Sequence, residues 1–221
     1  FGFGVPDDQL FDQVVARASA AETSGFRSLW VMDHLYQLPA LGGADQPMLE
    51  AYTLLGALAA RTTTATLGTM VTGVTYRNPA LLAKIVTTLD VISKGRAVLG
   101  LGAAWHDLEH TGYGFDFPPV GERMDRLEEA LQICRAMFER DHVDFDGAHY
   151  RTEDARNLPR PVQSGGPEIL VGGGGERRTL RLVAQYADAC NLHGDPAGIR
   201  QKLDVLHRHC ADVGRDPAEI R

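Results

Sequence analysis

Short apolar runs alternate along this chain with longer stretches in which apolar residues recur every three or four positions. Apolar runs of four to eight residues are typical of buried strands, and the longer pattern is typical of amphipathic helices. This alternation limits the fold more than any other feature. It predicts strands at 1–5, 28–32, 65–71, 96–101, 168–171 and 188–192, with a seventh beginning at Ile220. It predicts helices from Asp7 or Asp8 to Gly25 and at 48–61, 78–94, 122–140, 179–187 and 196–213.

A strand followed by a helix, repeated six times, fits either a doubly wound parallel sheet or a (β/α)8 barrel. We favour the α/β barrel because polar or glycine-rich segments follow several strands, whereas a doubly wound sheet gathers its site at one switch point. A complete barrel has about 250 residues, and this chain has 221. We therefore expect one barrel domain over residues 1–221 that lacks its last two strands.

The alternation stretches after the fourth predicted strand. Residues 106–167 contain the long helix 122–140, a hairpin and a proline-rich run at 157–167. In the hairpin, 143–145 pairs with 149–150 around Asp146-Gly147, a dipeptide typical of two-residue hairpin turns. We expect residues 106–167 to form an insertion within the barrel.

Composition and charge exclude several classes of protein. The net charge is −7 and no basic stripe stands out, which argues against a nucleic-acid partner. No apolar run approaches the roughly 18 residues needed to span a bilayer, so we expect no membrane partner. The cysteines Cys134, Cys190 and Cys210 are far apart in the sequence, as in a reduced cytoplasmic protein.

Asp33 and His34 directly follow the second predicted strand, so we expect His34 to project over the mouth of the barrel. Histidine titrates near pH ~6.5 and can accept or donate a proton at neutral pH. A solvent-exposed loop histidine, with Asp33 capping a helix, explains the same two residues equally well. Position alone leaves both interpretations open.

Four consecutive glycines, Gly172 to Gly175, follow the fifth predicted strand and lead into a helix. Glycine lets the backbone approach a ligand closely, and a helix N-terminus offers free N–H groups. Arg177, Arg178 and Arg181 add positive charge. A tight turn alone needs only one or two glycines, so this segment predicts an anion site for a phosphate.

Gly100 and Gly102 lie in a segment that superficially matches a dinucleotide-binding fingerprint. The third glycine is absent and Gly100 falls inside the predicted strand, which weakens that interpretation. We expect these glycines to let the backbone pack closely against a flat ring instead. Trp105, just beyond them, is either a rim aromatic or a core aromatic.

Residues 106–110 have the H-x-x-E-H spacing of inverted zinc proteases. Such a site needs a stable helix to place both histidines on one face. Gly112 and Gly114 follow at once, and the sequence places no third ligand. We therefore expect no metal site.

At these residues the sequence resembles the bacterial luciferase-like oxidoreductases, and particularly the branch that depends on the deazaflavin coenzyme F420. The matches run in order through nearly the whole chain, and the ordered set is hard to obtain by chance. They are AETSGF (21–26), LWVMDH (29–34), LGT (67–69), YRNP (76–79), TLDVISKGR (88–96), LGLGAAW (99–105), GER (121–123) and VGGGGERRTLRL (171–182).

The resemblance implies a luciferase-like (β/α)8 TIM barrel with a flavin or deazaflavin in its mouth. It implies that His34 is the acid/base beside the reacting ring, with Asp33 as its neighbour and Glu109 as a further catalytic acidic residue. It also implies a non-proline cis peptide against the ring, for which Met70-Val71 is the nearest match. The other implied cofactor-binding residues are Ala103, Ala104 and Trp105 at the ring and Gly172, Gly173, Gly174, Gly175, Glu176 and Arg177 at the phosphate.

The resemblance further implies an oxidoreductase that transfers a hydride between reduced F420 and a small organic substrate. Residues 106–167 would then carry the substrate lid, and the protein would be a homodimer. An FMN-dependent monooxygenase that uses molecular oxygen is the alternative, although Asp33-His34 favours the deazaflavin branch. A non-catalytic relative that only binds the cofactor and a metal-dependent barrel hydrolase also remain open.

Overall fold

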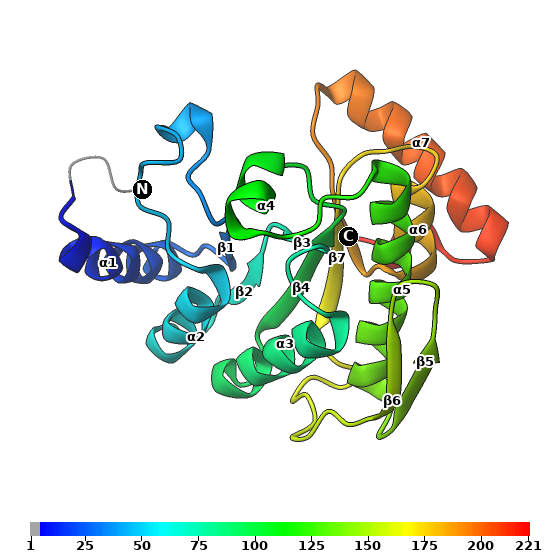
Figure 1. Ribbon diagram of the computed structural model, residues 1–221, viewed down its shortest axis with the longest axis horizontal. Coiled ribbons are helices and arrows are strands. Elements are labelled where there is room, and N and C mark those ends of the chain that lie inside the picture. The colour runs from blue at the N-terminus through cyan, green and yellow to red at the C-terminus, as the bar shows by residue number, and fades with distance from the viewer. Residues whose placement is uncertain (1–4) are drawn as a thin grey trace.

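The computed structural model describes residues 5–221, so the strand predicted at 1–5 lies, apart from Val5, outside the described residues. Figure 1 labels the elements. The helices are α1 (Leu10–Thr23), α2 (Ala51–Arg61), α3 (Pro79–Ser93), α4 (Asp107–Tyr113), α5 (Val120–Glu139), α6 (Thr179–Tyr186) and α7 (Pro196–Val213). The strands are β1 (Ser28–Val31), β2 (Thr66–Thr69), β3 (Thr72–Gly73), β4 (Ala97–Gly102), β5 (Val143–Asp146), β6 (Arg151–Ala155), β7 (Glu168–Gly172) and β8 (Ala189–Asn191). Single 3-10 turns lie at Asp7–Gln9, Pro39–Leu41 and Pro217–Glu219.

The central sheet is parallel, with spatial order β1-β2-β4-β7-β8 and with β3 beside the end of β4. These five strands therefore lie side by side in the same order in which they occur along the chain. At least one helix lies in the sequence between each strand of this order and the following one. A doubly wound sheet would reverse this order at its switch point, whereas a barrel does not. The barrel prediction is therefore confirmed, and the described residues form a curled section of it (Figure 1).

The seventh strand is predicted to begin at Ile220, and in the structure the next residue, Arg221, pairs with β8. The backbone N–H of Cys190 donates to the Arg221 carbonyl at 2.9 Å, and the N–H of Arg221 donates to the Asp188 carbonyl at 3.1 Å. Arg221 therefore continues the parallel order beyond β8.

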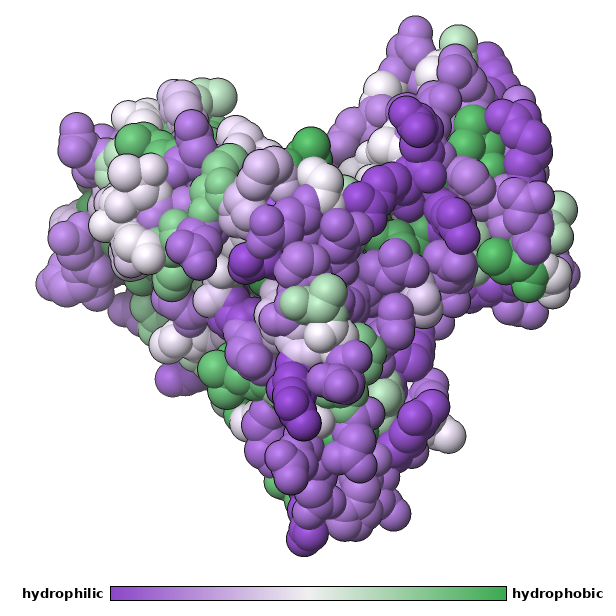
Figure 2. Space-filling model, turned by 45° about the vertical axis from the view of Figure 1, so that its right-hand side comes forward, coloured by the Kyte–Doolittle hydropathy of each residue, from purple (hydrophilic) through white to green (hydrophobic). Residues whose placement is uncertain are grey.

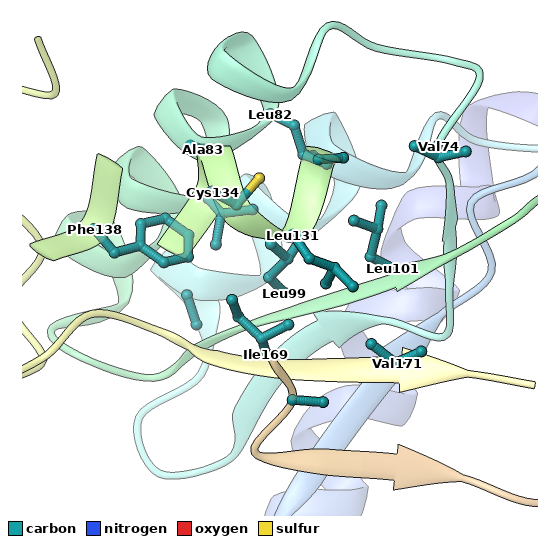
Figure 3. Close-up of a cluster of buried hydrophobic side chains, with 14 of the residues drawn as sticks. Val74, Leu82, Ala83, Leu99, Leu101, Leu131, Cys134, Phe138, Ile169 and Val171 are labelled. Carbon is teal, nitrogen blue, oxygen red and sulfur yellow. The ribbon is translucent and has the colours of Figure 1, made fainter. Parts of the chain in front are cut away.

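Helices pack against one face of the sheet and bury the main hydrophobic core between them. Alternate residues of β4 and β7 point into this core, as the pleat of a strand requires. Figure 3 shows them meeting side chains from α3 and α5. The core includes Leu82 and Ala83 of α3, Leu99 and Leu101 of β4, Leu131, Cys134 and Phe138 of α5, and Ile169 and Val171 of β7.

The opposite face of the sheet carries the intervening residues of β4 and β7, together with a residue of β8. They form a second, smaller cluster made of Val98, Leu170 and Ala189, with Trp30, Met70 and Val71 packed against it. Both faces of β4 are therefore covered, which explains why its sequence is apolar throughout.

Glycines on this inner face leave room for the chain after β2. The peptide Met70–Val71 is cis, which confirms the cis bond that the resemblance implied there. A Cβ atom on Gly100 would lie 1.9 Å from the Thr69 carbonyl oxygen, and one on Gly102 would lie 2.9 Å from Val71 Cγ2. The prediction of space for a flat ring is therefore wrong at Gly100, where the Thr69 carbonyl fills that space. At Gly102, which lies next to Val71 and lines a cavity, it stays a prediction.

The predicted hairpin exists, but its turn is longer than the sequence suggests. The second strand is Arg151–Ala155 and not 149–150, so four residues join the strands. The carboxylate of Glu129 on α5 accepts the N–H groups of Ala148, His149 and Tyr150 at 2.8 to 3.3 Å. These hydrogen bonds fix the four-residue loop against α5, and the loop is therefore too long for a two-residue turn.

The face of the molecule in Figure 2 is mostly hydrophilic, with its apolar residues in small separate patches. Within residues 5–221, the structure has no helix both long enough and apolar enough to cross a membrane.

Candidate active site

A cavity of about 470 Å³ opens at the carboxyl ends of the parallel strands. Small-molecule sites span about 300–1,000 Å³, and barrel enzymes place theirs at this end of the sheet. The cavity brings together most of the predicted site residues, whereas Glu109, Glu176 and Arg177 lie outside its lining. The predicted residues that line it are Asp33, His34, Met70, Val71, Ala103, Ala104, Trp105, Gly172, Gly173, Gly174 and Gly175.

His34 lies at the cavity wall with one ring nitrogen bound to a carboxylate. Its Nδ1 is 2.7 Å from Oε1 of Glu109, and its side chain is 13% exposed. Because an ionised carboxylate only accepts hydrogen bonds, Nδ1 carries the proton. In the neutral ring, Nε2 then has a free lone pair that can accept a proton.

Glu109, on α4, is completely buried next to His34. Its carboxylate accepts the N–H groups of Leu35 at 2.7 Å and Tyr36 at 3.3 Å, together with the hydroxyl of Tyr76. Burial alone would raise the pKa of Glu109, but the hydrogen bonds from Tyr76, Leu35 and His34 outweigh it and lower the pKa. Glu109 therefore stays ionised as the partner of His34.

Asp33 is buried and paired with a cation of the loop before α3. Two guanidinium nitrogens of Arg77 donate to its carboxylate at 2.6 and 3.2 Å, and the same guanidinium donates to Glu50 at 2.6 Å. Burial raises the pKa of Asp33 even though the charge of Arg77 opposes it. Arg77 also lies 4.8 Å from the ring centre of Tyr52. Asp33 thus ties the end of β1 to α2 and the loop before α3.

Trp105 is a rim aromatic, with 61% of its surface exposed. Its ring stacks on His106 at 4.9 Å and meets the His34 ring edge-on at 5.4 Å. Ala104, beside it, has a positive φ of 60°, which turns the chain at this point of the cavity wall. This segment therefore supplies a flat apolar surface next to His34.

The prediction that residues 106–110 lack a stable helix is wrong. Helix α4 runs through Tyr113, and Gly114, with φ 73°, is its left-handed C-terminal cap. His110 is completely buried, and its ring nitrogens lie 2.6 Å from the Thr75 hydroxyl and 2.7 Å from the His106 carbonyl. Among residues 5–221, no group of three or more His, Cys, Asp or Glu side chains is placed to hold a metal ion.

The first of the four glycines, Gly172, ends β7, and the other three begin the turn to α6, where Gly173 has a φ of 111° that disfavours any side chain. Arg177 is exposed beside this turn. Arg178 instead donates to the Gly121 carbonyl and pairs with Asp125, so it ties the turn to α5 and does not face the cavity lining. The contribution of Arg178 to an anion site, expected from the sequence, is therefore not supported by its position.

The cavity also has lining residues that the sequence reasoning missed. Asn191 ends β8 and His193 follows it, so the same reasoning from strand ends that selected His34 could have found both. Tyr76 lies in the YRNP motif, but nothing in the sequence indicated its orientation. Val120 and Met124 of α5 carry no chemical signal, because their place on the cavity depends on how α5 packs. The missed residues are Thr72, Gly73, Tyr76, Val120, Met124, Thr179, Asn191 and His193, whereas Gly102, which also lines the cavity, is expected from the sequence to lie beside the ring.

The model of the luciferase-like monooxygenase family matches residues 3–221. The chain therefore belongs to this family, which is a family of oxidoreductases. The family prediction from the sequence motifs is confirmed, and the relatives below include members of the F420-dependent branch.

An F420-dependent glucose-6-phosphate dehydrogenase of Nocardia farcinica is 38% identical over 178 residues, which cover 79% of this chain and 50% of the relative. The uncharacterized protein Rv0953c of Mycobacterium tuberculosis is 30% identical over 214 residues, covering 91% of this chain and 74% of that protein. The chain thus spans about half the length of the dehydrogenase it matches.

Solved structures share the fold. An F420-dependent secondary alcohol dehydrogenase in complex with an F420-acetone adduct matches with a TM-score of 0.84 at 24% identity, covering 96% of this chain and 63% of that one. The monooxygenase RslO1 of Streptomyces bottropensis matches with a TM-score of 0.80 at 24% identity, covering 95% and 63%. These matches establish the luciferase-like barrel architecture.

Proposed function

We propose that this protein is an F420-dependent oxidoreductase that transfers a hydride between the reduced deazaflavin and a small organic substrate. The observation that carries the proposal is the pair of His34 and buried Glu109 at a cavity bounded by the Met70–Val71 cis peptide. The names of relatives that use F420 support the choice of cofactor. A cytoplasmic homodimer and a single barrel domain whose 106–167 segment carries the substrate lid are parts of the same proposal.

The residues of the cavity fit a flat ring with a phosphate tail. Met70, Val71 and the segment from Ala103 to Trp105 offer apolar surface for the ring. The turn at Gly172 to Gly175 precedes α6, and Glu176 and Arg177 follow it before the helix begins, so N–H groups of this segment can hold a phosphate. When bound, the deazaflavin supplies the hydride from its ring.

His34 completes the reaction by moving the proton. When a carbonyl substrate receives the hydride at carbon, its oxygen needs one proton, which the doubly protonated ring of His34 can donate from Nε2. In the reverse direction, the free lone pair of Nε2 accepts the hydroxyl proton. Glu109 holds the ring in this orientation, and Asp33 fixes the end of β1 through Arg77. The reaction therefore balances with one hydride and one proton.

An FMN-dependent monooxygenase is the second candidate, because an EDTA monooxygenase of Chelativorans shares the fold with a TM-score of 0.83 at 15% identity, covering 96% of this chain and 56% of that one. A non-catalytic cofactor-binding relative would have no use for the ionised Glu109 beside His34. The three possibilities differ in which cofactor binds and whether it reacts.

We expect the full-length protein to bind F420 at least about tenfold more tightly than FMN, a difference of about 1.4 kcal/mol. Fluorescence titration with each oxidised cofactor measures both affinities. Gly173→Ala should weaken F420 binding because its φ of 111° is unfavourable with a side chain. Gly121→Ala is the matched control, since a Cβ there would meet no atom within 4 Å. Tighter binding of FMN would contradict the proposal.

A further inference from the structure

Tyr76 contacts the pair formed by His34 and Glu109 at the carboxylate of Glu109. It lies between β3 and α3 and lines the cavity. Its hydroxyl donates to Oε1 of Glu109, the same oxygen that lies 2.7 Å from Nδ1 of His34. One carboxylate oxygen is therefore shared between a tyrosine and a histidine that belong to different strand ends.

The ring of Tyr76 is fixed by its surroundings. It stacks on His110 with ring centres 4.9 Å apart and planes 28° apart, and His110 is itself held by the Thr75 hydroxyl at 2.6 Å. Phe115 lies against the ring at 5.9 Å, and a Cβ on Gly73 would come within 3.0 Å of it. The hydroxyl is thus directed at Glu109 by packing as well as by its hydrogen bond.

We propose that Tyr76 is a positioning residue that keeps Glu109 ionised, so that Glu109 keeps the proton of neutral His34 on Nδ1 and leaves Nε2 free. The consequence for the redox reaction rests on the proposed function. If Glu109 became protonated, it could donate to Nδ1, and the neutral ring would then carry its proton on Nε2. His34 would lose its ability to accept a proton from substrate. Tyr76 therefore acts through Glu109.

The charges around Glu109 are consistent with this role. Burial and then the hydrogen bond to Glu109 raise the pKa of Tyr76, so the phenol stays protonated and remains a donor. The negative charge of Asp33 is paired with Arg77. The titratable and charged groups that face Glu109 and Tyr76 from the surrounding elements are His34 and Asp33 after β1, Arg77 before α3, and His110 on α4. His106, just before α4, meets the ring of His34 instead.

Nuclear magnetic resonance of the full-length, cofactor-free protein tests the proposal with carbon-13-labelled glutamate and nitrogen-15-labelled histidine. Tyr76→Phe removes the donor and should raise the titration midpoint of Glu109 by roughly one to two pH units. The nitrogen-15 signal of His34 Nδ1 should change with that titration, because a protonated Glu109 no longer accepts the Nδ1 proton as an ionised carboxylate does. An unchanged midpoint in Tyr76→Phe would overturn the proposal.

Tyr113→Phe is the matched control, because Tyr113 lies on the same helix as Glu109 and is 53% exposed. It should leave both signals unchanged. Replacement of Tyr76 by 3,5-difluorotyrosine provides a second variant that retains the ring and hydroxyl if Tyr76→Phe fails to fold. Its stronger donor should lower the Glu109 midpoint, and no change there would also overturn the proposal.

These measurements need no cofactor, so they separate the role of Tyr76 from the choice between F420 and FMN. A failure of F420 to bind would leave the expected changes at Glu109 and His34 intact. An unchanged Glu109 midpoint together with tight F420 binding would reject only the role of Tyr76.

Discussion

Replacing His34 with alanine is expected to lower kcat by about 10²–10⁴-fold, the range typical of a lost general acid or base. The affinity for F420 should change by less than about threefold, because the proposal assigns proton transfer to this ring and cofactor binding to other residues. The Nε2 atom of His34 is the group to which the proposal assigns proton transfer, and Glu109 holds that ring in place. Single-turnover kinetics with reduced F420, combined with a binding titration, measure the two effects separately.

His207→Ala is the control for this variant, since His207 is an exposed histidine on α7. It should leave both kcat and F420 affinity unchanged. Full turnover by His34→Ala with normal F420 binding would contradict the proton-transfer role. A loss of binding alone would instead assign His34 to the cofactor site without a role in chemistry.

Replacing Gly100 with alanine is expected to lower the free energy of unfolding by at least about 3 kcal/mol or to prevent folding. A Cβ there would lie 1.9 Å from the Thr69 carbonyl oxygen, and a backbone atom cannot move aside as a flexible side chain can. The Thr69 hydroxyl also donates to the Gly100 carbonyl at 3.0 Å, so the two strands are joined at this point. Urea unfolding followed by circular dichroism measures the loss.

Gly56→Ala provides the matched comparison within the same fold. Gly56 lies inside α2, and a Cβ there would meet no atom within 4 Å. Alanine is a better helix former, so this variant should be up to about 1 kcal/mol more stable. Equal stability of the two variants would show that contact between β4 and residues 69–71 does not decide the effect.

The barrel could be predicted from the sequence because each helix buries one stripe and each strand is short and apolar. The α2 helix shows the limit of that reasoning. Its apolar pattern extends to residue 48, but the helix begins at Ala51 because the Glu50 side chain accepts the Thr53 N–H at 2.7 Å. A capping contact of this kind depends on local geometry that periodicity does not contain.

The residues of the candidate site also fall into those that the sequence could predict and those that it could not. His34 and the four glycines could be selected because each follows a strand, and strand ends meet at one edge of a parallel sheet. The contact between His34 and Glu109 joins residues 75 positions apart, and only the resemblance to a known family indicated Glu109. The filling of the space beside Gly100 by Thr69 and Val71 depends on how closely two neighbouring strands approach, which periodicity does not contain.

A crystal structure of the full-length protein with F420 tests the central claim most directly. We predict that the deazaflavin ring lies against Val71 with its hydride-carrying carbon on the side of His34, and that its phosphate binds the N–H groups between Gly173 and Arg177. A ring bound away from the carboxyl ends of the strands, or a phosphate held outside that turn, would contradict the proposed function.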